Sequence, residues 1–347
     1  MVSISAIITS IGEYNLDNPT PITIQQCILD YLDTVKMARS KNTYVTYRNG
    51  INYFQQVLAV HHLEIKTSPI TDLTEEAVIW FTASLKVYSA STERLYLTAM
   101  NGFYDYLAAE NLTQVNLPRI KMIIRQRARK PGQRLPQFPA NQIEQIIETM
   151  LHLTEKNYTN ENEYLRDLRD RSFLLTLADT GLRVHEACNL HRGDIDWNEG
   201  QAIIIGKGNR QDVVRFSSRS MTAMKEYLHK RAPIDGNSNR PLPSLPLFAR
   251  HDKGSGDKIK PMTTTTGRNI VAEWVEKILG KEAVGTITPH SFRHYFVTRV
   301  LRSSGNLKLA QELARHRNIT VTQRYAHLSN DELDKGYSQA IEENNKK

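Results

Sequence analysis

The chain has 347 residues, which is long enough for two ordinary domains with hydrophobic cores of their own. Hydrophobic residues make up 40% of it, and no apolar run approaches the roughly 18 residues of a membrane span. The N-terminal sequence lacks the basic start and the small-residue cleavage site of a secretory signal. The two cysteines, Cys27 and Cys188, give neither a disulfide framework nor a metal-ligand spacing. We therefore expect a protein of the reducing cytoplasm.

The net charge is +8, and the distribution of the basic residues says more than this total. Seven lysines and arginines lie between residues 119 and 134, a stretch that contains no acidic residue. A localised cationic segment favours binding to a polyanion. The same pattern is typical of a solvated linker, so composition alone leaves both interpretations open.

The spacing of apolar residues predicts four amphipathic helices between residues 22 and 116. Their apolar stripes consist of Ile24, Cys27, Ile28, Tyr31, Leu32 and Val35, then Tyr44, Tyr47, Ile51, Phe54 and Leu58, then Ala77, Phe81 and Leu85, and finally Tyr96, Met100, Phe103 and Leu107. Four such helices suffice for a small all-α bundle. Lys41, Arg48 and Arg94 lie on the predicted polar faces, where they suit phosphate contacts and suit water equally well.

Residues 117–139 are predicted to form an extended, basic linker between two domains. Four prolines, at positions 118, 131, 136 and 139, surround the basic cluster in this segment. Arg125, Arg127 and Arg129 belong to that cluster and are candidates for phosphate contacts.

Residues 140–328 are predicted to form a second domain, mostly helical but mixed α/β. Asn141 and Glu144 resemble a capping box that opens its first helix, and the next helix is expected to run to Asp179. Segments 201–205 and 212–216 are short and rich in Ile and Val, which predicts a small antiparallel hairpin across a glycine-containing turn. Further helices are expected over 263–279, 291–303, 307–316 and 320–325.

Residues 329–347 are predicted to be a C-terminal oligomerisation tail. Ser329 and Glu332 resemble a capping box for a helix over residues 331–341. Its narrow apolar stripe, formed by Leu333, Tyr337, Ala340 and Ile341, suits docking on a neighbouring protomer.

The second domain contains several ionisable residues whose types suit phosphoryl transfer. Arg183 is expected just inside a helix, with Glu186 one turn later on the same face. Lys207 occupies the hairpin turn, where its flexible ammonium can project past the sheet. The remaining members are His290 and Arg293, one helical turn apart, His316, and Tyr325 nine residues after it.

These residues fit phosphoryl transfer to a tyrosine hydroxyl without a metal or a nucleotide cofactor. Guanidinium groups match the geometry of phosphate and stay charged, so two arginines can stabilise the transition state. Imidazoles donate hydrogen bonds and move protons near neutral pH. A tyrosine hydroxyl, with a pKa near ~10, needs local cations or a base to become a nucleophile. A lysine can protonate the departing oxygen.

The motifs around these residues resemble those of tyrosine site-specific recombinases, the Cre, phage-integrase and Xer-like family. They read GLRVHEACNL followed by GDI, GKGNR in the hairpin, PHSFRH, and LARHRNITVTQRYAH, in family order and with family-like spacing over residues 22–345. Each motif alone is weak, but four in order make coincidence very unlikely.

The resemblance implies roles for individual residues and a partner. Arg183, Lys207, His290, Arg293 and His316 would activate the phosphate, Tyr325 would be the nucleophile, and Glu186 would support them. It implies an N-terminal helical core-binding domain and an α/β catalytic domain that close on double-stranded DNA as a C-shaped clamp. The expected function is site-specific recombination through a 3′-phosphotyrosyl link and a Holliday junction, without metal or ATP. A homotetramer on two sites made of inverted half-sites, located at the nucleoid, is also expected.

The sequence departs from the family pattern before His316, where many relatives have glycine and this chain has Arg315. We expect Arg315 to be tolerated with a negative φ. Relatives with elaborate regulation carry an extra N-terminal domain, and we expect none here because about 21 residues precede the first predicted helix. Arg268, at the start of the helix predicted over 263–279, is a candidate for a base contact, although the threonines before it are as well explained as helix caps.

Two other functions compete with recombination. A type IB topoisomerase shares the chemistry but rejoins the same strand, and a non-catalytic DNA-binding regulator would share the fold alone. Each residue also has a structural interpretation: Tyr325 as packing, Arg183 as a surface pair with Glu186, and Lys207 as a solvated turn residue. We assign His185, His191 and His294 no chemical role, and Cys188 is expected in the core.

Overall fold

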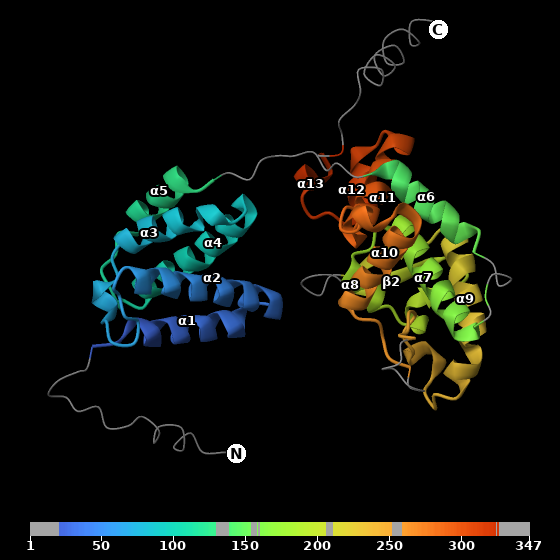
Figure 1. The fold of residues 1–347 in the computed structure, drawn as a ribbon, viewed down its shortest axis with the longest axis horizontal. Helices are drawn as coiled ribbons and strands as arrows, with labels where there is room; N and C mark the ends of the chain where they lie inside the picture. The colour runs from blue at the N-terminus through green and yellow to red at the C-terminus, as the bar shows by residue number, and fades with distance from the viewer. Residues whose placement is uncertain are drawn as a thin grey trace, which may run out of the picture. The chain divides into compact units, whose positions relative to one another are not determined.

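The computed structural model describes residues 21–129, 139–153, 158, 160–205, 211–251, 259–323 and 325. The chain divides into two compact units, Met1–Gln133 and Arg134–Lys347. Helices dominate both units (Figure 1). Among the described residues, no helix combines the length and the apolar character needed to cross a membrane.

The N-terminal unit contains the four predicted helices, which confirms the expected all-α bundle. They are α1 (Ile24–Ala38), α2 (Lys41–Val60), α3 (Glu76–Ser84) and α4 (Ala90–Ala109), with 3-10 turns η3 (Ile70–Asp72) and η4 (Leu85–Val87). Side-chain oxygens of Thr23, Ser40 and Ser89 cap α1, α2 and α4 by accepting backbone N–H groups. The apolar stripes meet in one core that includes Phe54, Phe81 and Phe103.

A fifth helix, α5 (Leu117–Arg127), corrects the prediction of an extended linker from residue 117. Asn116 caps it by accepting the backbone N–H of Arg119 at 3.0 Å. Pro118 lies in its first turn, where a proline has no hydrogen bond to lose and its φ suits a helix. Ile120 and Ile123 are buried in the N-terminal core, so burial anchors this segment to the first unit. Residues 130–138 lie outside the described residues.

The C-terminal unit is mostly helical, as predicted. Its helices are α6 (Ala140–Leu151), α7 (Glu161–Thr180), α8 (Val184–Cys188), α9 (Ser218–Gly236), α10 (Thr264–Leu279), α11 (Pro289–Ser304), α12 (Leu307–Ala314) and α13 (Ile319–Gln323). Short 3-10 turns lie at η6 (Arg192–Asp194), η7 (Leu242–Ser244) and η8 (Lys281–Ala283). The tail residues 326–347 lie outside the described residues, as does the tail helix predicted over 331–341.

The C-terminal unit also contains a small antiparallel sheet of order β1-β2-β3. Strands β2 (Gln201–Ile205) and β3 (Gln211–Arg215) form the predicted hairpin, with Gln201 opposite Arg215 and Ile205 opposite Gln211. A short strand, β1 (Ile195–Asp196), adds to the free edge of β2. Two residues carry too little periodicity for the sequence to predict such a strand.

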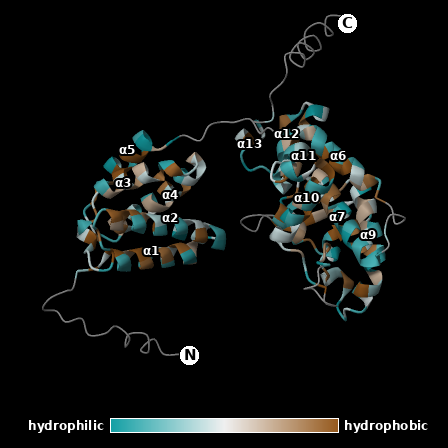
Figure 2. Cartoon of the chain, in the orientation of Figure 1, coloured by the Kyte–Doolittle hydropathy of each residue, from teal (hydrophilic) through white to brown (hydrophobic). Residues whose placement is uncertain are grey.

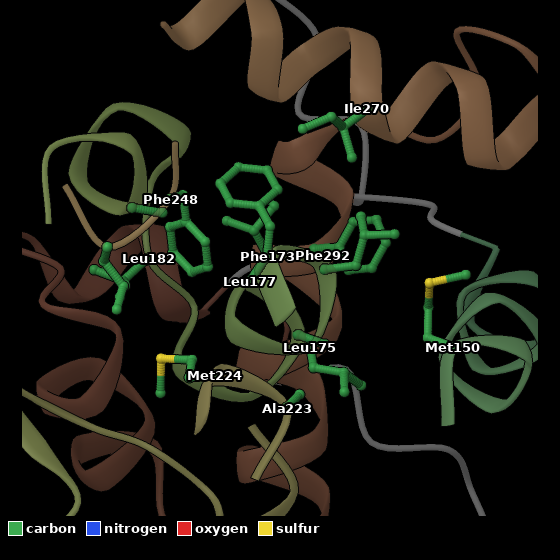
Figure 3. Packing of buried hydrophobic residues seen from close by; sticks show 14 of the residues in the cluster. Met150, Phe173, Leu175, Leu177, Leu182, Ala223, Met224, Phe248, Ile270 and Phe292 are labelled. Carbon is green, nitrogen blue, oxygen red and sulfur yellow. The ribbon is translucent and has the colours of Figure 1, made fainter. Parts of the chain in front are cut away.

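Helix α7 forms the centre of the second unit. Its residues from Ser172 to Ala178 are all buried, because α6, α9 and α11 pack around it. Figure 3 shows Phe173 and Leu177 of α7 close to Phe292 of α11. The hydropathy colouring shows the mixed apolar and polar composition of the helices around this core (Figure 2). This packing fixes the end of α7 and the start of α11, which both border the site described below.

Local helix starts differ from the predictions in informative ways. The capping box at Asn141 is wrong, because α6 already begins at Ala140 after Pro139. Helix α11 begins at Pro289 instead of residue 291, so His290 lies inside its first turn. Thr263 caps α10 by accepting the N–H of Thr266 at 3.1 Å, which confirms the capping interpretation of these threonines.

Candidate active site

The turn between α7 and α8 sets the position of the first arginine. Gly181 ends α7 with φ +58°, a left-handed conformation that glycine adopts without steric cost. A Cβ at this position would lie 2.4 Å from the Phe296 ring, so α11 also requires glycine here. The turn leaves Arg183 as the N-cap of α8, just outside the helix, and not inside it as predicted.

Arg183 and Glu186 form a close pair at the start of α8. The Glu186 carboxylate accepts the Arg183 backbone N–H at 2.8 Å and its guanidinium Nη1 at 2.7 Å. The Glu186 side chain is 4% exposed, whereas that of Arg183 is 44% exposed. Burial alone raises the pKa of Glu186, but these hydrogen bonds and the nearby cations outweigh it and lower the pKa. The pair therefore presents a guanidinium to solvent on a fixed anionic support.

Helix α11 carries three site residues on one face. His290 and His294 are four residues apart, and their rings pack edge to face at 4.2 Å. Arg293 is almost fully buried and donates from Nη1 to the Gly181 carbonyl and from Nη2 to the Ala314 carbonyl. Two carbonyls from different elements thus orient one guanidinium fork.

His316 follows α12 and is held by the next helix. Its Nδ1 lies 2.8 Å from the Thr322 hydroxyl of α13, and its backbone N–H donates to the Gln311 carbonyl at 3.0 Å. Arg315, just before it, has φ +56° and ends α12 in the left-handed conformation. The expectation of a negative φ at Arg315 is therefore wrong, because this residue turns the chain back after the helix as a glycine would.

Tyr325 reaches the same cluster. Its hydroxyl contacts Nδ1 of His294, and the two rings are 5.2 Å apart. The sequence analysis assigns His294 no chemical role, and the structure places its ring against Tyr325. The available signal is its position four residues after His290, since a helix places such residues on one face.

Burial, and then the neighbouring charges, lower the pKa of the three histidines described in the site. Burial and nearby Arg293 lower the pKa of His316 to about 4, and burial with His290 and Arg293 lowers that of His294 to about 4. The pKa of His290 is also lowered, by burial and then by Arg293 and Arg183. Burial and then the positive charges of Arg183 and Arg315 lower the pKa of Arg293 to about 9. Such crowding of cations is favourable for binding an anion.

The other predicted residues lie in different situations. Lys207 falls in residues 206–210, outside the described residues. Lys41, Arg48, Arg94, Arg125, Arg127 and Arg268 are exposed. Arg129 is also exposed, but its guanidinium is bonded within the N-terminal unit, to the Glu93 carboxylate and to the Leu85 and Tyr88 carbonyls. Cys188 is buried, as predicted.

The fold and this site define the class of protein. Residues 137–332 match the phage integrase family, and residues 28–111 match the phage integrase N-terminal SAM-like domain. The first match alone spans more than half of the chain, so the chain belongs to the phage integrase family. It is accordingly a tyrosine recombinase, an enzyme that breaks and rejoins DNA.

Individual relatives agree with this assignment. The tyrosine recombinase XerC of Staphylococcus aureus (strain JH9) is 28% identical over 313 residues, which cover 89% of this chain and 94% of that protein. The Tn1549 transposon integrase in complex with transposon right end DNA has a TM-score of 0.63 at 17% identity, covering 92% of this chain and 99% of that one. XerH recombinase bound to palindromic difH substrate, a post-cleavage complex, has a TM-score of 0.63 at 16% identity, covering 92% and 98%. These two structures support the fold.

Proposed function

We propose that Tyr325 is the nucleophile of a site-specific recombination reaction and that it forms a 3′-phosphotyrosyl intermediate. The observation that supports this role most strongly is its contact with His294 beside Arg293 and His316. A tyrosine hydroxyl is activated where cations favour its ionised form and a neutral imidazole can accept its proton. The described members of the site all belong to the C-terminal unit.

Two guanidinium groups stabilise the scissile phosphate in this proposal. Arg183 offers an exposed fork, and Arg293 offers N–H groups from a buried and oriented one. His290 and His316 add hydrogen bonds to the non-bridging oxygens. Their depressed pKa values keep both imidazoles neutral at pH 7 in the free enzyme, and an arriving phosphate anion raises those pKa values.

Lys207 is the proposed acid that protonates the departing 5′-oxygen. Lys207→Ala should then slow cleavage far more than DNA binding. A 5′-bridging phosphorothiolate needs no proton on its leaving sulfur, so this substrate should largely rescue the variant. Equal deficits on the oxygen and sulfur substrates would remove Lys207 from this role.

Strand exchange completes the reaction. The free 5′-hydroxyl of one duplex attacks the phosphotyrosyl bond of the partner duplex, which releases Tyr325 and forms a Holliday junction. Because each phosphodiester is replaced by a phosphotyrosyl ester and then restored, the sequence of steps needs no ATP. Arg183 and Arg293 supply the positive charge that a metal would otherwise provide in this proposal.

The experiment that tests recombination compares strand transfer with relaxation. Two duplexes that share an inverted-repeat site should give junctions and exchanged products, equally well in excess EDTA. A type IB topoisomerase would relax supercoiled DNA of any sequence without exchanging strands, and a non-catalytic regulator would leave both substrates intact. Relaxation without exchange at any site would overturn the proposal.

We propose that the active assembly is a homotetramer, with two protomers on each pair of inverted half-sites, at the nucleoid. Residues 329–347 are the segment proposed to dock on a neighbour, because a helix of about eleven residues is too short to be stable alone. Truncation after Leu328 should preserve binding to a single half-site and abolish pairing of two sites. Normal recombination by the truncated chain would exclude this role.

A further inference from the structure

Arg315 combines a left-handed backbone with a buried side chain. Its φ and ψ are 56° and 43°, a region where a residue other than glycine is uncommon. Its side chain is nevertheless only 4% exposed. A long cationic side chain is rarely buried unless specific partners hold it, so its contacts explain why this side chain lies inside the protein.

The contacts of Arg315 join the end of α12 to the turn between α7 and α8. Nη1 donates to the carbonyls of Leu313 at 3.2 Å and of Thr180 at 3.5 Å. Nη2 donates to the Gly181 carbonyl at 3.3 Å and to Oε2 of Glu186 at 3.4 Å. One guanidinium therefore connects the segment that leads to His316 with the turn that presents Arg183.

Two of these acceptors also hold the proposed phosphate-binding arginines. The Gly181 carbonyl accepts from Arg293 as well as from Arg315. Glu186 uses Oε1 for the Arg183 guanidinium, while its Oε2 accepts from the Arg183 backbone and from Arg315. Without Arg315, the buried carboxylate would have Arg183 as its remaining ion-pair partner among the described residues.

We propose that Arg315 is a positioning residue for the cleavage reaction, which holds Glu186 and the Gly181 carbonyl so that Arg183 and Arg293 face the scissile phosphate. This inference rests on the proposed roles of these two arginines. Arg315 itself is placed behind the substrate site, because its two Nη groups already donate to four acceptors, whereas those of Arg293 donate to two among the described residues. Its positive charge adds to that of Arg183 in neutralising Glu186, and it holds the carboxylate in the position from which Arg183 faces solvent.

The test compares Arg315→Gly with Arg315→Lys and with the wild-type chain. Glycine suits the left-handed backbone, so Arg315→Gly removes the guanidinium without adding strain. Single-turnover cleavage of a nicked half-site duplex should be slower by about 10-fold or more, with the half-site Kd within about twofold of wild type. Arg315→Lys keeps a charge but not the fork, so it should also cleave slowly.

Two further readouts separate positioning from general damage. Guanidinium chloride at millimolar concentration should accelerate cleavage by Arg315→Gly relative to matched sodium chloride, because the ion fits the vacated space. In a double-mutant cycle with Glu186→Gln, the loss of cleavage rate in the double variant should be smaller than the product of the two single losses. Cleavage by Arg315→Gly at the wild-type rate, or a slow rate with no rescue and no coupling to Glu186, would overturn the proposal.

Failure of the proposed function would look different. In that case the wild-type chain itself would form no covalent adduct with the half-site. The coupling between Arg315 and Glu186 can still be measured from thermal unfolding of the same four chains, and its absence there would refute the contact on which the positioning role depends.

Discussion

Each unit of the molecule buries one glutamate between two basic side chains, and the two arrangements differ in what they leave exposed. In the N-terminal unit, Glu93 pairs with Lys86 at 2.8 Å and with Arg129 at 2.5 Å. In the C-terminal unit, Glu186 pairs with Arg183 at 2.7 Å and with Arg315 at 3.4 Å. Both carboxylates are almost fully buried, and hydrogen bonds and cations lower the pKa of each against the effect of burial.

The surroundings of the two carboxylates differ in a way that matches the roles proposed for them. Arg129 uses its other N–H groups on the Leu85 and Tyr88 carbonyls, so the Glu93 cluster ties the chain after α5 to the bundle. Glu186 lies beside Arg293 as well as its own two arginines, and the histidines nearby are kept neutral. Three guanidinium groups around one carboxylate leave an excess of positive charge that a phosphate can neutralise. The same local motif thus ties chain segments together in one unit, and in the other it supports the proposed phosphate-binding arginines.

The largest expected effect comes from removing one of the arginines around Glu186 that are proposed to bind the phosphate. Arg183→Ala or Arg293→Ala should reduce single-turnover cleavage by about 1,000-fold, because transition-state charge loses its preorganised donors. Arg171→Ala is the matched control, since Arg171 pairs with Glu226 in the same unit at 2.7 Å and belongs to no part of the proposed site. Rates measured with saturating protein should separate the two cases. Similar cleavage rates for Arg183→Ala and Arg171→Ala would contradict a special role of the arginines around Glu186.

Breaking the structural cluster should instead change stability. Glu93→Gln removes the charge that two cations share and should lower the free energy of unfolding of the N-terminal unit by about 1–3 kcal/mol. This effect is measured by urea denaturation, with hydrogen exchange of the α4 amides as the probe of unfolding. Cleavage by the folded, DNA-saturated variant should keep its wild-type rate, and a large loss of rate at saturation would contradict a purely structural cluster.

Local sequence patterns predict some of these features, and others depend on contacts between distant parts of the chain. The stripes of apolar residues predict the bundle, and the short segments rich in Ile and Val predict the hairpin, because these patterns act locally. Helix α5 escapes prediction because prolines resemble a linker signal, although Pro118 sits in the one turn of a helix that accepts proline. The contact of His294 with Tyr325 and the inward path of Arg315 depend on three-dimensional neighbours, and no local pattern specifies them.

Low pH should affect the two units in different ranges. The histidine pKa values in the site lie below the ordinary 6.5, two of them at about 4, so the folded C-terminal unit binds fewer protons than its unfolded chain between these values. Stability of this unit therefore falls as the pH drops from 6.5 toward 4. The lowered pKa of Glu93 stabilises the N-terminal unit above the ordinary value of 4.5, and this contribution is lost only below it.

Hydrogen exchange of the DNA-free protein at about pH 7, 5.5 and 4.5 measures both units in one sample. His316→Gln should flatten the pH dependence of the C-terminal unit and leave that of the N-terminal unit unchanged. A C-terminal unit that keeps constant stability over this range would show that the site histidines are not held neutral by their surroundings.

The smallest effect concerns the salt dependence of DNA binding. Arg125 and Arg127 are exposed on α5, so replacing both with alanine should reduce the slope of log affinity against log salt by up to about 0.9 for each phosphate that is no longer neutralised. Arg129→Ala should change the slope less, because its guanidinium is already bonded to Glu93. Equal slope changes for all three arginines would mean that Arg129 leaves Glu93 when DNA binds.

The covalent link to Tyr325 tests the central claim most directly. In a duplex with a nick just downstream of the cleavage position, cleavage releases a short fragment that carries the new 5′-hydroxyl. Without this hydroxyl the adduct cannot be reversed, so it accumulates. Digestion and mass spectrometry of the trapped protein in excess EDTA should find the 3′-phosphate on the peptide that contains Tyr325. Tyr325→Phe should bind the same duplex with unchanged affinity and form no adduct. An adduct on another residue, an adduct that persists in Tyr325→Phe, or cleavage that requires added Mg²⁺ would contradict the account.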